Sequence, residues 1–324
     1  MLKAARAFVV AAVVIALLVG GTNGEESKVT DKMALPDFDE WWDYGNPAQT
    51  RERFEKIRST ALESGNKSYY LQLLTQIART YGLESEFQTA HDLLDTVKAE
   101  LTRDLKLAKV RYLLERGRTF RSNNEPGRSA PLFHESYDLA REIENDFLAI
   151  DAAHMIALIE KKTEEKLKWN HAAIELAEKT SDARARGWLG SLYNNMGWFL
   201  HGEKKYDRAL EIFEKALEFR KSQGKNQEIN IARWCIGRTL RSLDRLDEAL
   251  DIQQALLEEY EQLGQTDGYV YEELAEIYYL KGDESQAQDF FARAHVELSK
   301  DTWLVNNEKE RLDRLKQLGG LADK

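Results

Sequence analysis

Residues 206–218 carry apolar side chains at the spacing of an amphipathic helix. The apolar stripe occupies positions i, i+3, i+4, i+7 and i+8, namely Ala209, Ile212, Phe213, Ala216 and Leu217. Charged residues occupy the opposite face. A second apolar stretch lies just before this one, and a polar segment that contains Gly202 separates the two. The pattern predicts two helices joined by a short turn between Tyr193 and Leu217.

Small residues mark where these two helices would meet. Two antiparallel helices approach closely only where side chains are small, and Gly197 and Ala209 lie twelve positions apart on the two helices. We expect this pair to form the close contact, with Leu200, Phe213 and Ala216 filling the seam. A single helix pair leaves its other face uncovered, so the pattern predicts that further pairs stack against it.

Small residues do recur along the chain at intervals of about forty residues, as in the longer helical repeats. Those of the predicted first helices are Ala78, Gly117, Ala157, Gly197, Gly237 and Ala275. Those of the second helices are Ala90, Ser129, Ala209, Ala249 and Ala287. The third unit is irregular, because Trp169 stands twelve residues after Ala157. A turn shortened by three residues would instead place Lys166 at the small position and Ala173 in the seam.

The central unit matches a known repeat motif. Its residues Tyr193, Met196, Gly197, Leu200, Ala209, Phe213 and Ala216 follow W-x2-L-G-x2-Y…A-x3-F…A, with Tyr193 in place of the Trp and Met196 in place of the Leu. The chain therefore resembles the tetratricopeptide repeat (TPR) family. WWDYGNPAQTRERF, ARGWLGSLYNNMGW and IARWCIGRTLRSLDRLDEAL are also similar to a group of exported bacterial TPR proteins that brings no assigned activity. The resemblance implies an all-α, right-handed superhelix of about six helix-turn-helix repeats.

The segments around the repeats divide the chain further. We expect a signal peptide at 1–24, a flexible tether at 25–35, an N-terminal capping segment at 36–66, the repeat array at 67–300, and a C-terminal capping helix and tail at 301–324. Trp41 and Trp42 are expected to seal the first repeat. Pro47 is expected to begin the capping helix, because Pro is favoured at the first helical position.

The first residues have the pattern of an export signal. Lys3 and Arg6 form a basic start, and the apolar run from Ala7 to Leu18 is too short to span a membrane comfortably. Small residues follow it. The pattern predicts a periplasmic or secreted protein, and an uncleaved membrane tether is the alternative. Cys235 is the one cysteine, so it forms no intramolecular disulfide, and we expect it in the core.

Composition and motifs exclude several function classes. The net charge of −10 argues against nonspecific nucleic-acid binding, which needs Lys and Arg to neutralise phosphates. The sequence has no Gly-rich phosphate loop, no H-E-x-x-H and no G-x-S-x-G, and its six His residues lack metal-ligand spacing. We therefore predict no catalytic residue, no metal and no cofactor, and no membrane insertion apart from the signal segment.

Binding of a protein or an extended peptide is the predicted function. In TPR arrays the first helices line a concave groove, and the resemblance places ten candidate residues there. They are Arg79, Arg118, Arg121, His154, Asn194, Trp198, His201, Trp234, Arg238 and Arg241. Arg offers forked donors to carboxylates, and Trp offers apolar area with one donor, which suits an extended, acidic or C-terminal peptide.

Alternatives stay open for the candidate residues and for the function. If the candidate residues are structural, Trp198 and Trp234 pack between repeats, and the Arg side chains pair with Asp and Glu of neighbouring helices. At the level of function, the alternatives to a binding scaffold are a structural protein that assembles through contacts between arrays and an enzyme whose ionisable pair is invisible in the sequence. The oligomeric state is left open by the sequence.

Overall fold

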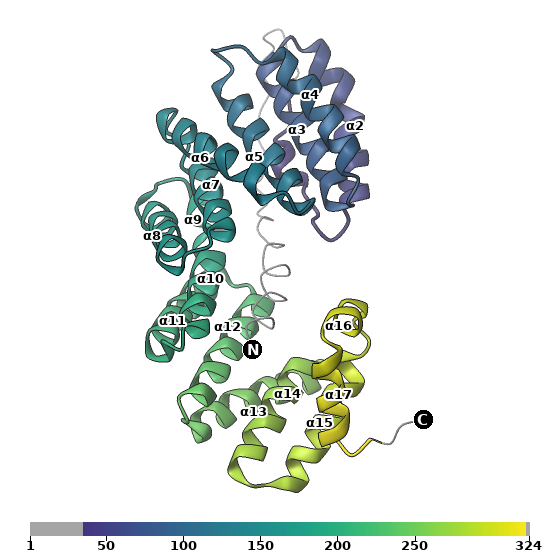
Figure 1. The fold of residues 1–324 in the computed structure, drawn as a ribbon, viewed down its shortest axis with the longest axis vertical. Helices are drawn as coiled ribbons and strands as arrows, with labels where there is room; N and C mark the ends of the chain where they lie inside the picture. Colours follow the sequence, from purple (N-terminus) through teal and green to yellow (C-terminus); the bar gives the residue numbers. More distant parts are fainter. Residues whose placement is uncertain (1–34, 322–324) are drawn as a thin grey trace, which may run out of the picture. The chain divides into compact units, whose positions relative to one another are not determined.

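The computed structural model describes residues 35–321, which are largely α-helical and contain no β-strand (Figure 1). The predicted signal peptide and residues 25–34 of the predicted tether lie outside the described residues. The expectation of an all-α chain built from paired helices is confirmed.

The helices follow one another along the chain with short connections. In order they are η1 (Phe38–Trp41), α2 (Pro47–Glu63), α3 (Lys67–Leu83), α4 (Phe87–Glu100), α5 (Lys106–Ser122), α6 (Pro126–Glu142), α7 (Asp146–Ile159), α8 (Thr163–Lys179), α9 (Ala183–Arg186), α10 (Leu189–Gly202), α11 (Tyr206–Gln223), α12 (Asn226–Ser242), α13 (Leu246–Gln262), α14 (Gly268–Lys281), α15 (Glu284–Leu298), α16 (Thr302–Asn307) and α17 (Lys309–Leu318). The predicted pairs are α3/α4, α5/α6, α7/α8, α10/α11, α12/α13 and α14/α15.

Five of these pairs share one turn geometry. A single residue with a positive φ ends each first helix, at Ser85, Asn124, Lys204, Asp244 and Gly282. The next residue then donates its N–H to the carbonyl five positions back, as Lys205 does to Leu200 at 2.9 Å. This is the Schellman arrangement, which satisfies carbonyl groups at the end of a helix.

The third pair differs as expected. Helix α8 begins at Thr163, six residues after Ala157, whereas α11 begins at Tyr206, nine residues after Gly197. The predicted shortening by three residues is confirmed. The sequence did not indicate the short helix α9, which Asp182 caps by accepting a hydrogen bond from the N–H of Arg184.

Gly197 lies directly against the ring of Phe213. A Cβ atom added at Gly197 would meet Cε1 of Phe213 at 2.5 Å, and its three nearest atoms all belong to that ring. Gly117 faces Phe133 in the same way. The nearest neighbour of each of these two glycines in the seam is therefore an aromatic ring of the second helix, and Ala209 is buried in the same seam as Gly197.

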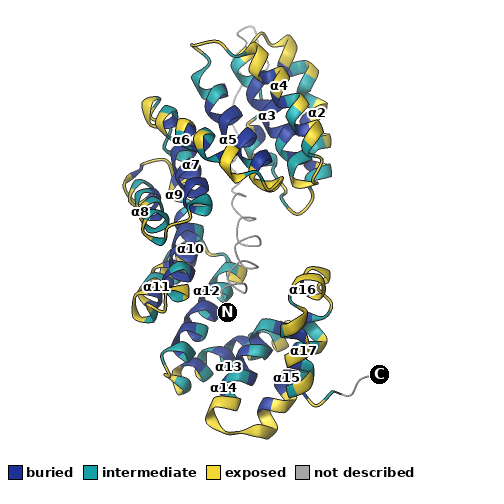
Figure 2. Cartoon of the chain, viewed as in Figure 1, coloured by how far each residue is buried: buried dark blue, intermediate teal, exposed yellow. Residues whose placement is uncertain are grey.

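The described chain divides into two compact units, with the boundary between Leu192 and Tyr193. We call residues up to Leu192 unit 1 and residues from Tyr193 unit 2. In both units the first helices carry more buried positions than the second helices, which expose one face (Figure 2). Cys235 of unit 2 is fully buried, which confirms its predicted place in the core.

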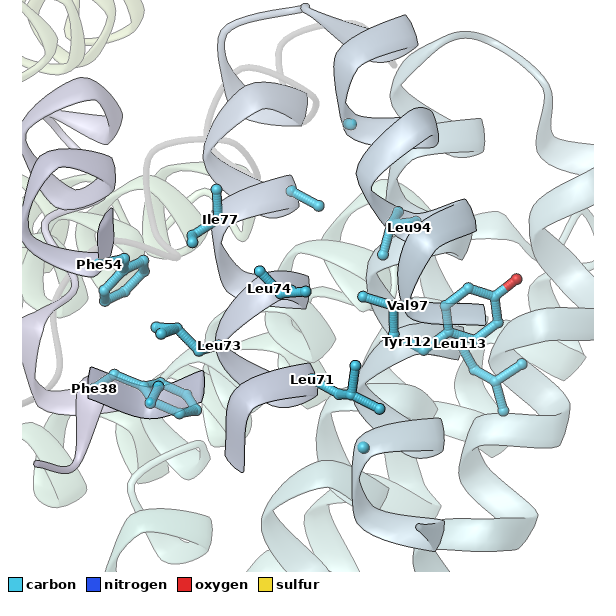
Figure 3. Packing of buried hydrophobic residues seen from close by; sticks show 14 residues of the cluster. Phe38, Phe54, Leu71, Leu73, Leu74, Ile77, Leu94, Val97, Tyr112 and Leu113 are labelled. Atoms are coloured by element: carbon cyan, nitrogen blue, oxygen red, sulfur yellow. The ribbon is translucent and has the colours of Figure 1, made fainter. Parts of the chain in front are cut away.

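A cluster of buried hydrophobic residues in unit 1 surrounds α3. Phe38 of η1 and Phe54 of α2 lie on one side of this helix, and Leu94 and Val97 of α4 lie on its other side (Figure 3). The segment before α2 thus contributes an aromatic ring to the core. Trp42 is half-buried and meets Phe54 edge to face at 5.4 Å between ring centres, consistent with a sealing role.

Candidate binding surface

The first-helix face of unit 1, formed by α3, α5 and α7, carries a row of alternating charges. Glu115 of α5 pairs with Arg79 of α3 at 3.4 Å and with Arg118 of its own helix at 2.6 Å. Arg118 also forms an ion pair with Asp151 of α7. Burial alone would lower the pKa of Arg118, but the carboxylates of Asp151 and Glu115 raise it above its ordinary value. Arg79 and Arg118 are thus brought together and already hold carboxylates.

Arg121 and His154 have different surroundings. Arg121 is exposed one turn beyond Arg118, and its guanidinium makes no hydrogen bond or ion pair within residues 35–321. His154 is buried, with its ring 5.5 Å from that of Trp188. Burial lowers the pKa of His154 to about 4, so its imidazole is neutral at pH 7. Of the four sequence candidates in unit 1, Arg121 is the one with an open guanidinium.

The segment from Pro36 to Tyr44 lies against the first helices of unit 1. Asp39 accepts hydrogen bonds from Nη1 of Arg111 at 3.0 Å and from Nη2 of Arg184 at 2.8 Å, so α5 and α9 hold one carboxylate between them. Trp42 and Tyr44 stack at 4.7 Å between ring centres, and the Arg79 guanidinium lies 4.9 Å from the Tyr44 ring. Much of this face is therefore covered by the chain itself.

Sequence reasoning missed the pair that holds Asp39. Arg111 lies on α5 seven residues, or about two turns, before the candidate Arg118, so extending the candidate face by two turns would have found it. Arg184 gave no such signal, because it lies on α9, outside the regular repeat. A pocket of about 340 Å³ lies beside the pair, with Asp39, Arg111, Arg184, Tyr69 and Phe147 among its lining residues.

In unit 2, two tryptophans on neighbouring first helices lie close together and are largely buried. Trp198 of α10 and Trp234 of α12 lie 5.9 Å apart between ring centres and are 9% and 8% exposed. The Trp234 indole donates to the carbonyl of Tyr269 at 3.1 Å. Asn194 is also buried, and its side-chain oxygen lies 3.6 Å from the Sγ of Cys235, which donates to it. These side chains pack mainly against one another and offer a ligand only their edges.

The arginines of unit 2 converge on a single carboxylate. Glu273 of α14 is buried, and its Oε1 lies 2.9 Å from Nε of Arg238. Arg241 donates to the same carboxylate from Nε at 2.7 Å and from Nη2 at 3.0 Å. Burial alone would raise the pKa of Glu273, but Arg238 and Arg241 hold it below its ordinary value. The two guanidiniums therefore face one charged acid.

His201 lies next to these arginines. Its Nε2 is 3.0 Å from the Oγ of Ser242, which also accepts a hydrogen bond from Nη1 of Arg238 at 3.1 Å. Burial and the charge of Arg238 lower the pKa of His201 to about 4. His201, Arg238 and Arg241 thus form one cluster in which the imidazole is neutral at pH 7.

A neighbouring row of acids is already occupied. Glu272 of α14 accepts a hydrogen bond from Nε of Arg311 at 2.9 Å, and Glu276 forms an ion pair with Arg314. Both arginines come from α17. The carboxylates beside the Arg238 cluster are therefore neutralised from the C-terminal side of unit 2.

The described residues form neither a metal site nor a membrane-spanning helix. In the part of the chain from 35 to 321, no group of His, Cys, Asp and Glu side chains has an arrangement that could hold a metal ion. Among the same residues, no helix combines the length and the apolar character that crossing a bilayer requires.

Comparisons with known proteins identify the repeat. Residues 189–222 match the family model described as tetratricopeptide repeat. No curated protein matches the sequence. Among solved structures, the apo form of RapI is similar with a TM-score of 0.67 and 16% identity, over 88% of this chain and 80% of RapI.

Two further structures are similar. A signal transduction ATPase with a tetratricopeptide repeat sensor, from Pyrococcus horikoshii, has a TM-score of 0.65 and 16% identity over 87% of this chain and 44% of the ATPase. A Rap protein complexed with competence and sporulation factor has a TM-score of 0.52 and 14% identity over 81% of this chain and 75% of the Rap protein.

Proposed function

We propose that this chain, which has the tetratricopeptide-repeat fold and so the architecture of a protein-interaction scaffold, is non-catalytic and binds an extended acidic segment of a partner on its first-helix faces. The Rap protein complexed with competence and sporulation factor gives this fold a precedent for holding a bound factor. An acidic ligand is expected because the candidate residues combine arginines, which bind carboxylates, with the edges of aromatic rings. These arginines are gathered on the first helices of a chain whose net charge is −10.

One observation carries the proposal: Arg238 and Arg241 share the single carboxylate of Glu273. Each guanidinium has five N–H donors, and one carboxylate cannot satisfy both groups. The Arg238 side chain is 26% exposed, and Glu273 and Ser242 fix its Nε and Nη1, whereas its Nη2 has no hydrogen-bond partner among the described residues. A partner carboxylate would meet a preorganised donor, which lowers the entropy cost of binding.

Replacing Arg238 with Gln tests this surface without leaving a buried charge unpaired. Glu273 keeps its two hydrogen bonds from Arg241, so the buried carboxylate remains paired. The probe is a fluorescein-labelled peptide in which Glu alternates with Ser around a single Trp. We expect Arg238→Gln to weaken its binding about tenfold, or about 1.4 kcal/mol.

The matched control is Arg233→Gln on the same helix, because Arg233 pairs with Glu259 of the second helix α13. This variant loses the same charge from α12 away from the Glu273 cluster. Equal loss of binding in both variants would indicate only nonspecific attraction. Unchanged binding in Arg238→Gln, with helicity preserved, would refute the proposed surface. A version of the peptide with Gln in place of Glu should not bind.

The proposed compartment is exported, by a signal peptide at 1–24. The basic start at Lys3 and Arg6 and the apolar run from Ala7 to Leu18 support it. N-terminal sequencing of the protein from its native host tests this proposal. A mature chain beginning near Glu25 is expected in the periplasm or medium, and an intact N-terminus in the membrane fraction would favour the tethered alternative.

A further inference from the structure

The segment from Pro36 to Tyr44 follows α3 in the direction of its chain. The hydroxyl of Tyr69 donates to the carbonyl of Pro36 at 2.8 Å, and further along α3 the side chain of Gln76 accepts from the Trp42 indole at 3.1 Å. Arg79, one turn later, lies over Tyr44. Later residues of the segment therefore contact later turns of α3, as the residues of a short peptide bound along a first helix would.

Two adjacent residues anchor this segment. Phe38 is buried in the core cluster, with its ring 5.1 Å from that of Tyr69. Asp39 is 11% exposed and lies between Arg111 and Arg184. The segment therefore contributes an apolar ring and a carboxylate. These are the two groups that we expect in a ligand that binds to arginine side chains and to the edges of aromatic rings.

The far end of the segment is fixed separately. The backbone N–H of Asp43 donates to the hydroxyl of Thr50 at 3.0 Å, and this hydroxyl donates to the carbonyl of Asp43 at 3.1 Å. Thr50 belongs to α2 and is buried. Residues 36–42 could lift from α3, α5 and α9 while this pair of hydrogen bonds keeps the segment attached to α2.

We propose that residues 36–42 are a tethered occupant of the first-helix face of unit 1, and that a partner segment with an aromatic residue beside an acidic one displaces them. The ligand class rests on the proposed function, but the site is in unit 1 and differs from the Arg238 cluster. Displacement exchanges one set of ion pairs for another, so the free-energy change is small compared with the strength of either set. The face would remain closed until such a partner is present at sufficient concentration.

The first test uses a labelled peptide with the chain's own sequence, LPDFDEWWDYG, added to the full chain. We expect weak binding to the native protein and at least tenfold tighter binding to the double variant Phe38→Ala, Asp39→Asn, whose own segment competes poorly. The control is Glu40→Gln, because Glu40 is exposed on the same segment and makes no ion pair among the described residues. A peptide with Ala and Lys at the places of Phe38 and Asp39 should not bind.

The second test does not depend on a folded variant. Amide hydrogen exchange of residues 36–42 in the native protein should become faster when the peptide is in excess, while exchange in α11 is unchanged. If the double variant has native helicity but binds no peptide, and exchange in the native protein does not change, the segment is a permanent cap and the proposal is wrong.

Two further substitutions separate this site from the one in unit 2. In the double variant, Arg111→Gln should abolish the tight binding of the LPDFDEWWDYG peptide, because it removes the guanidinium that holds Asp39 in the native protein. Arg238→Gln should remove only the weaker binding of an acidic peptide to unit 2 and should leave the tight binding unchanged. The opposite result, with binding lost in Arg238→Gln and retained in Arg111→Gln, would overturn the assignment to unit 1.

Discussion

Gly197 of α10 lies against the ring of Phe213 of α11, and a Cβ atom at Gly197 would come within 2.5 Å of Cε1. Carbon atoms in favourable nonbonded contact are about 3.5–4.0 Å apart, so a side chain at this position would have to displace the ring. Phe213 is fully buried and has little room to move. The glycine is required by packing at this position, not by backbone conformation.

We therefore expect Gly197→Ala to destabilise the protein by about 2 kcal/mol, as overpacking in a well-filled core does. Urea unfolding followed by circular dichroism measures the change. Gly202→Ala is the control on the same helix, because an added Cβ at Gly202 meets no atom within 4 Å. That variant should be neutral or slightly stabilising, since Ala favours helix over Gly. Equal effects of the two variants would contradict the packing argument.

Arg118 and Arg121 should separate stability from binding in unit 1. Arg118→Gln leaves the buried carboxylate of Asp151 without its ion-pair partner and should cost about 3 kcal/mol in unfolding free energy. Arg121→Gln removes an exposed guanidinium and should change stability by less than about 0.5 kcal/mol. Chemical denaturation of both variants tests this. A stable Arg118→Gln variant would show that the row of charges on this face is not structural.

Asp39 should make part of the stability depend on pH. Burial alone would raise its pKa, but Arg111 and Arg184 hold it below its ordinary value of 3.8. A carboxyl whose pKa is lower in the folded than in the unfolded state stabilises the fold fully above the unfolded pKa, and this contribution is lost as the pH falls through the folded pKa.

Asp39→Asn should accordingly lower the unfolding free energy by about 2 kcal/mol at pH 7, and the difference from the native protein should shrink below pH 4. Urea unfolding at a series of pH values measures both effects. Glu40→Gln is the matched control and should show no such dependence. A constant difference between pH 7 and pH 3 would mean that the Asp39 charge does not stabilise the fold.

Gln253 of α13 is a fully buried amide where α11 has Phe213. Its Nε2 donates to the carbonyl of Trp234 at 3.4 Å, and its Oε1 has no hydrogen-bond partner among the described residues. An unpaired buried polar atom costs about 1–3 kcal/mol. Gln253→Met, of similar shape, should therefore stabilise the protein by about 1 kcal/mol. Gln254→Met is the control and should not, because Gln254 donates to the Tyr278 hydroxyl at 2.8 Å.

The sequence predicted the features that depend on neighbours along the chain. Helix pairing and the shortened third turn followed from the spacing of residues such as Ala157 and Gly197. The sequence predicted that Phe213 lies in the seam but not that its ring contacts Gly197, because spacing shows which face a residue occupies and not which atoms touch. Such contacts depend on how far each helix is rotated and shifted against its partner.

The candidate site was less predictable for a related reason. The arginines were found from their positions on the first helices, but not the carboxylates that hold them. Asp39 and Arg184 are 145 positions apart, and no periodic pattern connects them. Glu273 was not a candidate, because a buried acid between two arginines has the same sequence pattern as an exposed one.

The five positive-φ turn residues offer attachment points for spectroscopic labels. Ser85, Asn124, Lys204, Asp244 and Gly282 adopt one backbone geometry with five different side chains, so the side chain there is not what fixes the turn. Cys235 is the one native thiol, and burial raises its pKa, so it should resist maleimide dyes. Cysteines introduced at Asn124 and Asp244 would place one fluorophore on each unit. Energy transfer between them would report in solution whether ligand binding changes the separation of the two units.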